Sequence, residues 1–133
     1  MELLVKHVQD VKFEASVRNH RVICDQPASL GGADEGMTPP EFLLVSLGTC
    51  AGYYAVQYLT TRGLPVQGLE VKVSAEKASG PARIASFRIE VIAPSLDAQH
   101  EEGVHRAVKA CLIHNTLLNA PAIETVVTTS VPA

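Results

Sequence analysis

The longest apolar stretch of the chain covers residues 38–59 and shows no polar face at helical spacing. A helix that is apolar on every side is normally buried, so the pattern predicts a central buried helix. About 20 residues would make it roughly 30 Å long. Pro39 and Pro40 fit the first helical positions, which need no amide hydrogen, and Thr38 fits the N-cap. Arg62 in the last turn and Gly63 after it indicate the end of the helix.

The segments on either side of this helix alternate or favour extended structure. Residues 2–8, 11–17 and 20–25 are β-prone runs separated by short polar pairs, which predicts a meander of hairpins. Residues 69–76 and 87–91 alternate apolar and polar positions as half-buried strands do, with a turn at Gly80-Pro81 between them.

A second helix is predicted over residues 98–118, because its apolar positions recur every three or four residues. Pro121 would stop it, and residues 123–131 then favour a final strand. The predicted order is therefore βββ–α–ββ–α–β. This is an α+β fold in which two helices pack on antiparallel strands. We expect a single domain spanning residues 1–133.

Composition narrows the possible classes of protein. Hydrophobic residues make up 47% of the 133 residues and charged residues 19%, which favours extensive burial and an obligate oligomer. A net charge of −3 without clustered Lys or Arg argues against nucleic acid as a partner. The N-terminus has no basic region followed by a long apolar run, so no signal peptide is expected. Glu41, Ser46, Thr49 and Gln57 interrupt the central helix, which argues against a membrane span and favours a cytoplasmic protein.

Three cysteines without a secretion signal argue against a structural disulfide framework. Cys50 lies in the small-residue middle of the first predicted helix (residues 46–52) and Cys111 in the second. Both fall on faces that a helix pair would bury together. They could simply fill the core, or one could be a nucleophile and the other a resolving thiol. Cys24, in a β-prone run, is interpreted as structural.

Metal and cofactor sites have little support in the sequence. There is no CxxC, HxxxH or HExxH spacing, no phosphate-binding glycine loop with a lysine, and no GxSxG. His114 follows Cys111 by three residues, but two ligands do not make a metal site. We therefore expect neither a metal nor a cofactor.

Three segments together resemble the OsmC/Ohr family of thiol-dependent hydroperoxide-handling proteins. They are GGADEG at residues 31–36, TPPEFLL at residues 38–44 with GTC at residues 48–50, and CLIHNTL at residues 111–117. The last is similar to the family's second-cysteine segment, in which a cysteine opens a helical CPxSxxL-like run. The resemblance covers the whole chain and is strongest in its OsmC-like branch.

The resemblance implies an intertwined homodimer with two long central helices and two sites at the interface. It implies a peroxidase that reduces organic hydroperoxides or hydrogen peroxide in oxidative stress defence. Cys50 would attack the O–O bond and form a sulfenic acid, Cys111 would condense with it to a disulfide, and an external dithiol would restore both. Arg18 or Arg21, from the N-terminal hairpin region, would assist Cys50. Tyr53 and Tyr54 would help to wall an apolar substrate pocket or would belong to the core.

One position departs from the family pattern. In the best-studied branches an acid stands ten residues before the first cysteine and orients the arginine, whereas here Pro40 occupies that position. Glu41 stands nine residues before Cys50, so at 100° per residue it would point roughly to the opposite side of the helix. We expect it to favour the helix N-terminus instead. The alternative function is a non-catalytic dimeric module, either a thiol redox sensor or a binder of small apolar ligands.

Overall fold

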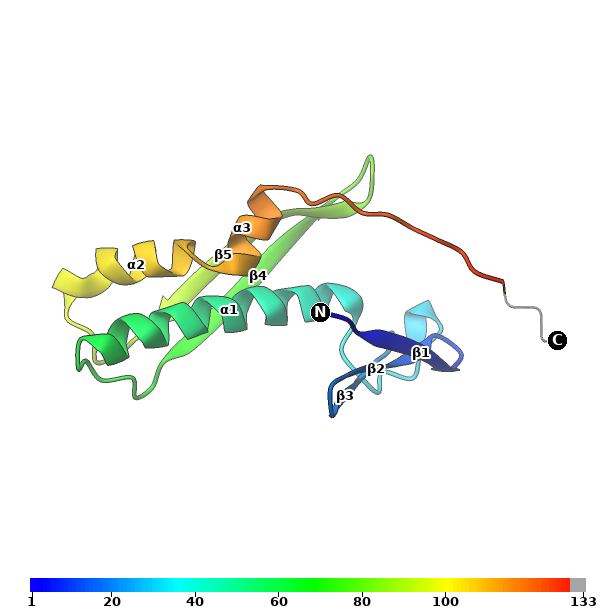
Figure 1. Cartoon of the computed structure of the whole chain (residues 1–133), viewed down its shortest axis with the longest axis horizontal. Helices are drawn as coiled ribbons and strands as arrows, with labels where there is room; N and C mark the ends of the chain where they lie inside the picture. The colour runs from blue at the N-terminus through cyan, green and yellow to red at the C-terminus, as the bar shows by residue number, and fades with distance from the viewer. Residues whose placement is uncertain (130–133) are drawn as a thin grey trace.

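The first three strands form an antiparallel sheet of their own in the computed structural model, which describes residues 1–129 (Figure 1). They are β1 (Leu4–Gln9), β2 (Lys12–Val17) and β3 (His20–Cys24), joined in sequence order. The two turns place Asp10 and Arg18 at positive φ, 50° and 54°. The predicted N-terminal meander is confirmed.

The long helix α1 spans Pro39–Thr61 and begins and ends where the sequence predicts. Thr38 is the N-cap, and its N–H and hydroxyl both donate to the Glu41 carboxylate at 2.9 Å. These bonds, led by the backbone N–H, lower the pKa of Glu41. Gly63 follows the helix at φ 65°, a conformation that glycine adopts without strain. Glu41 thus serves the helix N-terminus as expected, through hydrogen bonds.

The prediction that α1 is buried on every side is wrong for the single chain. One stripe, four residues apart, is buried: Leu47, Ala51, Ala55 and Leu59. Another side leaves apolar side chains in solvent, namely Val45 (42% exposed), Tyr53 (57%) and Val56 (39%). Apolar residues occur on all sides of α1, but a single chain supplies packing partners for only part of the helix surface.

The length and composition of α1 would also let it cross a membrane. Core helices of soluble proteins meet the same criterion, so this is weak evidence for a membrane protein.

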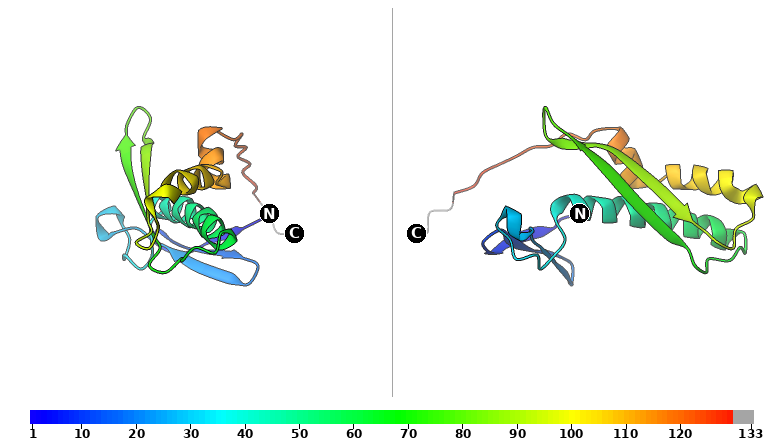
Figure 2. Two further views of the ribbon diagram at one scale, coloured as in Figure 1. Left: turned by 90° about the vertical axis from the view of Figure 1, so that its left-hand side faces the viewer. Right: turned by 180° about the vertical axis from the view of Figure 1, so that it is seen from behind.

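Strands β4 (Glu70–Ala78) and β5 (Arg83–Ile92) form a long antiparallel hairpin that lies against the helices (Figure 2). The hairpin and its turn at Gly80-Pro81 confirm the second prediction of paired strands. Glycines on α1 let the helix approach β4 closely. A Cβ added at Gly48 would lie 2.9 Å from Val73 Cγ2, whereas one at Gly52 would lie 3.5 Å from Val71 Cγ2.

This difference predicts unequal effects of two matched substitutions. Gly48→Ala and Gly52→Ala both gain about 1 kcal/mol of helix propensity. Only the first forces β-branched Val73 to move, because 2.9 Å is closer than real Cβ contacts. We expect Gly48→Ala to be less stable than Gly52→Ala by about 1–3 kcal/mol, the usual cost of overpacking. Urea unfolding of both variants measures the difference, and equal midpoints would contradict the close packing.

The prediction of one continuous helix over residues 98–118 is wrong. A 3₁₀ turn (Ala98–His100) leads into α2 (Glu101–Lys109), and a separate helix α3 covers Leu112–Leu118. The break is at Cys111, whose backbone is extended at ψ 132°, and its Sγ accepts the N–H of His114 at 3.5 Å. The apolar spacing continues across this break, so periodicity did not reveal it. A cysteine that opens a helix is what the family resemblance implied.

The core lies between α1, α2 and the hairpin. Its buried members are Ala51, Ala55, Leu59, Val104 and Val108, and side chains of β4 and β5 cover them. Gly103 of α2 lets Tyr58 of α1 pack directly against the helix backbone, since a Cβ there would lie 2.2 Å from the tyrosine oxygen. The Tyr58 hydroxyl is hydrogen-bonded to His100 Nδ1 at 3.1 Å. The two helices are therefore held in close contact at this end of α1.

The predicted strand over residues 123–131 is not formed within the described part of the chain. Residues 123–129 are neither helix nor strand, and positions 130 and 131 lie outside the described residues. Ile123, Val126 and Val127 are 86%, 73% and 86% exposed, and this segment extends away from the helices (Figure 1). A strand needs a hydrogen-bonding neighbour, and the described residues of this chain provide none here.

Candidate functional site

The structure brings Cys50 and Cys111 together although 61 positions separate them in the sequence. Helix α3 packs against α1, and Cys50 lies near enough to Cys111 to raise the pKa of the Cys111 thiol. Both are free thiols. Cys111 is fully buried, with 0% exposed, while Cys50 is half-buried. The pair therefore combines one partly exposed cysteine with one that solvent reaches only after local opening.

The surroundings of Cys111 favour its protonated form. Burial raises the pKa of the Cys111 thiol, and the neighbouring Cys50 raises it further. The backbone N–H groups of His114 and Ile113 act in the opposite direction, but the net shift is upward. Because the thiolate is the stronger nucleophile, the raised pKa makes Cys111 less reactive in the reduced protein.

The position of Cys50 within α1 gives its sulfur no help from the helix ends. It lies 11 residues after Pro39, about three turns into the helix. The charge-stabilising effect of a helix N-terminus falls off within the first turn. A thiolate at Cys50 would therefore need a neighbouring cation for stabilisation.

Both candidate arginines belong to the N-terminal sheet and its turns, and neither is bonded to a cysteine in the described part of the chain. Arg18 lies in the turn between β2 and β3, and Arg21 lies on β3 opposite Ser16, both exposed. Among residues 1–129, no hydrogen bond or ion pair joins either guanidinium to a cysteine. Figure 1 shows why: the N-terminal sheet lies beyond the first turn of α1, away from its middle. The structure thus unites the two cysteines and leaves both arginines apart from them.

The two tyrosines near Cys50 have different surroundings. Tyr53 is 57% exposed and accepts a hydrogen bond from Gln57 Nε2 at 2.8 Å. Its ring meets the edge of Tyr54 at a centroid distance of 5.3 Å. Tyr54 also lines a shallow hollow together with Leu112 and Asn115 of α3. One of the two tyrosines therefore borders a surface depression beside the start of α3, and the other faces solvent.

Sequence reasoning missed Asp25, a buried carboxylate that organises the loop before α1. Only 1% of Asp25 is exposed, and it accepts the N–H groups of Gln26, Ala33 and Glu35 at 2.8, 3.2 and 3.1 Å. These bonds, the one from Glu35 first, lower its pKa. Gly32 passes so close that a Cβ would lie 1.9 Å from the Gln26 oxygen. An aspartate at the head of a glycine-rich loop was the available signal, since its side chain commonly caps nearby amides.

The lowered pKa of Asp25 predicts a pH-dependent loss of stability in Asp25→Asn. The ionised carboxylate stabilises the fold above its ordinary pKa of about 3.9, and this contribution disappears as pH falls through the lower folded-state value. We expect the variant to be less stable than the wild type at pH 7, and the difference to shrink below about pH 4. Urea unfolding between pH 7 and pH 3 measures this. Asp34→Asn, in the exposed part of the same loop, is the control, and a deficit independent of pH would contradict the assignment.

No group of three His, Cys, Asp or Glu side chains is placed to hold a metal ion in residues 1–129.

Comparison of the sequence with known proteins identifies a family that contains these helices, the hairpin and the two cysteines. A family model described as OsmC-like protein matches residues 31–126, which include α1, the hairpin and both cysteines. A comparison with curated proteins finds no match.

Several solved structures share the fold. A Psychrobacter arcticus protein named for osmotic stress and detoxification response superposes with TM-score 0.78 at 20% identity, covering 86% of this chain and 85% of that one. An OsmC-like protein of Mycoplasma pneumoniae gives 0.74 at 18% identity, with 90% and 87% covered. A Legionella pneumophila protein named as an organic hydroperoxide resistance protein gives 0.68 at 12% identity, with 87% of both chains covered. The likeness confirms the predicted α+β fold.

Proposed function

The chain belongs to the OsmC-like protein family, and from this membership we propose that it is a thiol-dependent peroxidase that reduces organic hydroperoxides or hydrogen peroxide. The observation that carries the proposal is the contact between a half-buried Cys50 and a fully buried Cys111. Two neighbouring thiols on packed helices can form a disulfide when their Cα atoms lie within about 7 Å of each other.

The proposed reaction has three steps: oxidation of Cys50, formation of the disulfide, and its reduction. The Cys50 thiolate attacks the distal oxygen of ROOH, the O–O bond breaks, and the departing alkoxide takes a proton to become ROH. Cys50 is then a sulfenic acid. The sulfur of Cys111 attacks the Cys50 sulfur, and the hydroxyl leaves with the Cys111 proton as water. An external dithiol reduces the resulting Cys50–Cys111 disulfide and is itself oxidised.

The surroundings of the two thiols support an attacking role for Cys50 and a resolving role for Cys111. Peroxide arriving from solvent meets Cys50 first, because Cys111 is covered on all sides. The raised pKa of Cys111 keeps its proton in place during the first step and makes that proton available for the water released in the second. Cys24 lies at the end of β3 in the N-terminal sheet, apart from the packing of α3 on α1 that brings Cys111 to Cys50, so we assign it no part in the reaction.

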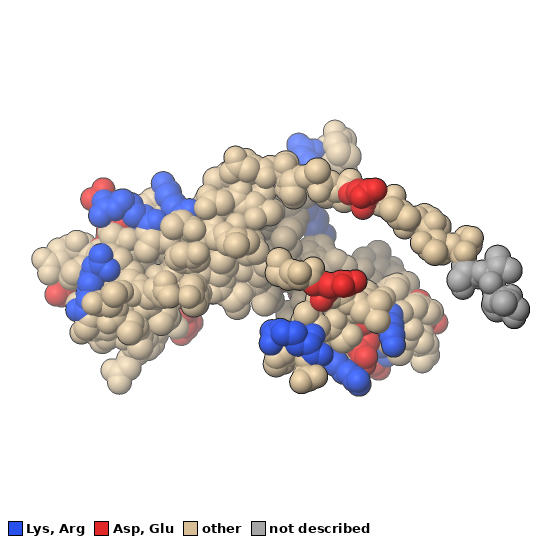
Figure 3. Space-filling view, viewed as in Figure 1, with Lys and Arg blue, Asp and Glu red and all other residues tan. Residues whose placement is uncertain are grey.

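We further propose that the working unit is a homodimer. The exposed apolar side chains Val45, Tyr53 and Val56 lie on one helix, and Figure 3 shows a broad surface with few charges between the two ends of the molecule. An apolar surface of this kind on a single chain is typical of an interface. In such a dimer the N-terminal sheet of the partner could bring Arg18 or Arg21 to Cys50, which would supply the cation that one chain lacks.

The second candidate function is a thiol redox sensor or apolar-ligand binder with the same fold. It is favoured by one observation: the Glu41 carboxylate is engaged by Thr38 at the helix end, and Pro40 carries no acid. No carboxylate on the first turn of α1 is then free to orient an arginine, which favours slow peroxide chemistry.

Intact mass measurement after one equivalent of cumene hydroperoxide tests the proposal. We expect the fully reduced protein to lose two hydrogens rapidly and peptide mapping to locate a Cys50–Cys111 link. The reduced protein without peroxide is the control for adventitious air oxidation. A mass that stays unchanged for minutes would contradict the peroxidase proposal and favour an apolar-ligand binder with the same fold.

A further inference from the structure

One loop, residues 25–37, joins the N-terminal sheet to the rest of the molecule. In the described part of the chain, the elements that pack extensively on one another fall into two groups. Strands β1, β2 and β3 form the first group, and α1, α2, α3 and the hairpin form the second. Figure 1 shows the sheet near the start of α1 and apart from α2 and α3. The place of the sheet relative to α1 therefore depends on how this loop is held.

The loop is closed by Asp25, the residue directly after β3. One carboxylate oxygen of Asp25 accepts the N–H of Gln26, and the other accepts those of Ala33 and Glu35. The N–H of Asp25 donates to the carbonyl oxygen of Met37 at 3.2 Å, and the next residue is the N-cap of α1. One buried residue thus ties the end of β3 to the segment that enters α1.

The loop is also packed against two strands of the sheet. A Cβ added at Gly36 would lie 2.3 Å from the carbonyl oxygen of Ile23 on β3, so the loop backbone passes directly over that strand. Glu35 forms an ion pair with Lys12 of β2. The sheet and the start of α1 are therefore held together closely, although the loop contains three glycines.

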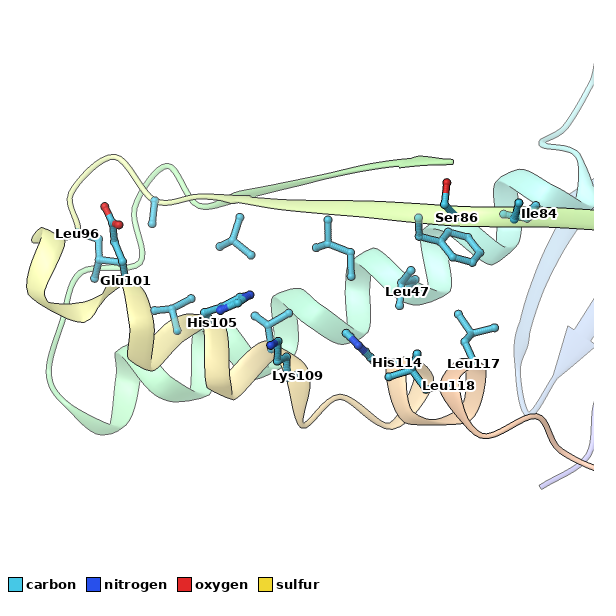
Figure 4. A pocket seen from close by; sticks show the side chains of 17 residues that line it. Leu47, Ile84, Ser86, Leu96, Glu101, His105, Lys109, His114, Leu117 and Leu118 are labelled. Atoms are coloured by element: carbon cyan, nitrogen blue, oxygen red, sulfur yellow. The ribbon is translucent and has the colours of Figure 1, made fainter. Parts of the chain in front are cut away.

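The N-terminal sheet carries two arginines that have no bonding partner in residues 1–129. Arg18 and Arg21 take part in none of the side-chain hydrogen bonds or ion pairs of this part of the chain. By contrast, the guanidinium carbon of Arg62 lies 3.7 Å from the ring centroid of Tyr58. Lys109 lines the hollow between β5, α2 and α3, which no cysteine lines (Figure 4). Three further arginines bond to oxygen atoms near them in sequence: Arg83, Arg88 and Arg106. The uncommitted guanidinium groups of the described chain therefore belong to the sheet.

From these contacts we propose that Asp25 is a positioning residue for the peroxidase reaction: it holds the loop closed and thereby fixes the place at which Arg18 or Arg21 meets Cys50. The inference rests on the proposed function, in which the sheet of the partner subunit supplies this cation. An opposite charge stabilises a thiolate only within about 4–6 Å, so a small swing of the sheet would remove the effect. In a symmetric dimer the same loop acts in both subunits.

A carboxylate is needed at position 25 because both of its oxygens act as acceptors. Asparagine has one acceptor oxygen, and its other terminal atom is an NH₂ donor. In Asp25→Asn the amide nitrogen must therefore face either the N–H of Gln26 or those of Ala33 and Glu35. One side of the loop is released, while the side chain keeps its size. Asp34→Asn, at an exposed position of the same loop, makes the same change of charge and is the matched control.

The rate at which iodoacetamide alkylates Cys50, measured as a function of pH with peptide mapping, tests the proposal. Alkylation follows the thiolate and requires no peroxide, and mapping separates Cys50 from Cys24 and Cys111. Removal of an anion favours a nearby thiolate by itself, so a through-space effect of Asp25→Asn would speed alkylation. Lost positioning of a cation predicts the opposite sign. A purely structural role for Asp25 predicts a lower unfolding midpoint without slower alkylation.

We expect Cys50 alkylation at pH 7 to be about tenfold slower in Asp25→Asn than in the wild type, and unchanged in Asp34→Asn. The double variant Arg18→Gln/Arg21→Gln should be slowed at least as much. Adding Asp25→Asn to it should slow alkylation no further, because no cation is left to position. Unchanged or faster alkylation in Asp25→Asn, equal slowing in Asp34→Asn, no slowing in the double variant, or a further fall in the triple variant would overturn the proposal.

Glu35→Gln replaces Asp25→Asn if that variant does not fold. It removes the ion pair with Lys12, which attaches the loop to β2, and it also removes an anion. Slower Cys50 alkylation would again have the opposite sign to a through-space effect. We expect a smaller fall than that for Asp25→Asn, and an unchanged rate would overturn the proposal.

The test is separate from that of the peroxidase. If cumene hydroperoxide oxidises the wild type but Asp25→Asn is alkylated at the wild-type rate, the positioning role fails and the peroxidase stands. If the peroxide leaves the wild type unoxidised but Asp25→Asn slows alkylation as expected, the peroxidase fails and Asp25 still positions the cation beside Cys50.

Discussion

Replacement of Cys50 by serine is expected to abolish peroxide consumption, with a loss of about 10³-fold or more in rate. A serine hydroxyl cannot be oxidised to a sulfenic acid, and a reaction that depends on one nucleophile falls to background when that nucleophile is removed. Cys111 cannot take over readily, because it is fully buried and burial raises its pKa. Consumption of cumene hydroperoxide with excess dithiothreitol measures the effect.

Cys24→Ser is the matched control for this experiment. Cys24 is also partly buried, and both burial and the charge of Asp25 raise its pKa, but it lies in the N-terminal sheet. We expect this variant to keep the wild-type rate. Wild-type activity in Cys50→Ser would refute the catalytic assignment. Loss of activity in Cys24→Ser alone would identify Cys24, in the N-terminal sheet, as the reactive thiol.

Replacement of Cys111 by serine is expected to permit the first half of the reaction and stop it there. With one equivalent of hydroperoxide and no added thiol, the variant should consume peroxide at the wild-type rate and accumulate Cys50 sulfenic acid. The one cysteine left besides Cys50 would be Cys24, which lies in the N-terminal sheet and is not expected to condense with it. Helix α3 should persist, because serine is a good N-cap and can accept the His114 N–H in place of sulfur.

Labelling with dimedone, which reacts with sulfenic acids, followed by peptide mapping measures this outcome. The wild type should show little label and a Cys50–Cys111 disulfide, and the variant should show label on Cys50. Excess peroxide should drive the variant to the irreversible sulfinic acid. A Cys111→Ser protein that forms an intramolecular disulfide as the wild type does would show that Cys111 is not the resolving residue.

Local chemistry was sufficient for the parts of the fold that depend on neighbours in sequence. The ends of α1 followed from Thr38, the two prolines and Gly63, since caps and chain terminators act within a few residues. The hairpins followed from alternation and turn residues for the same reason. The glycine at position 48 of α1 lets β4 lie close to the helix, with the side chain of Val73 directly against it.

Periodicity was misleading where the chain changes direction without losing its apolar spacing. Cys111 continues the stripe of α2, yet its extended backbone ends one helix and opens another. The strand expected after Pro121 is not formed in residues 123–129, for a different reason. Alternation shows which side chains a segment can bury, but not whether a neighbouring strand is present to pair with it. The organising role of Asp25 was also missed, as its three backbone partners are spread over ten residues of loop.

The sequence by itself determined the helix ends, the hairpins, the α+β class and, through motif resemblance, the family. The tertiary structure alone decided that Cys50 and Cys111 come close to each other, that only Cys50 of this pair is partly exposed, and that Arg18 and Arg21 belong to the separate N-terminal sheet. The physical reason is that caps, turns and periodicity arise from interactions over a few residues. The contact between two thiols 61 positions apart depends on how α3 packs on α1, and that packing is a property of the whole core.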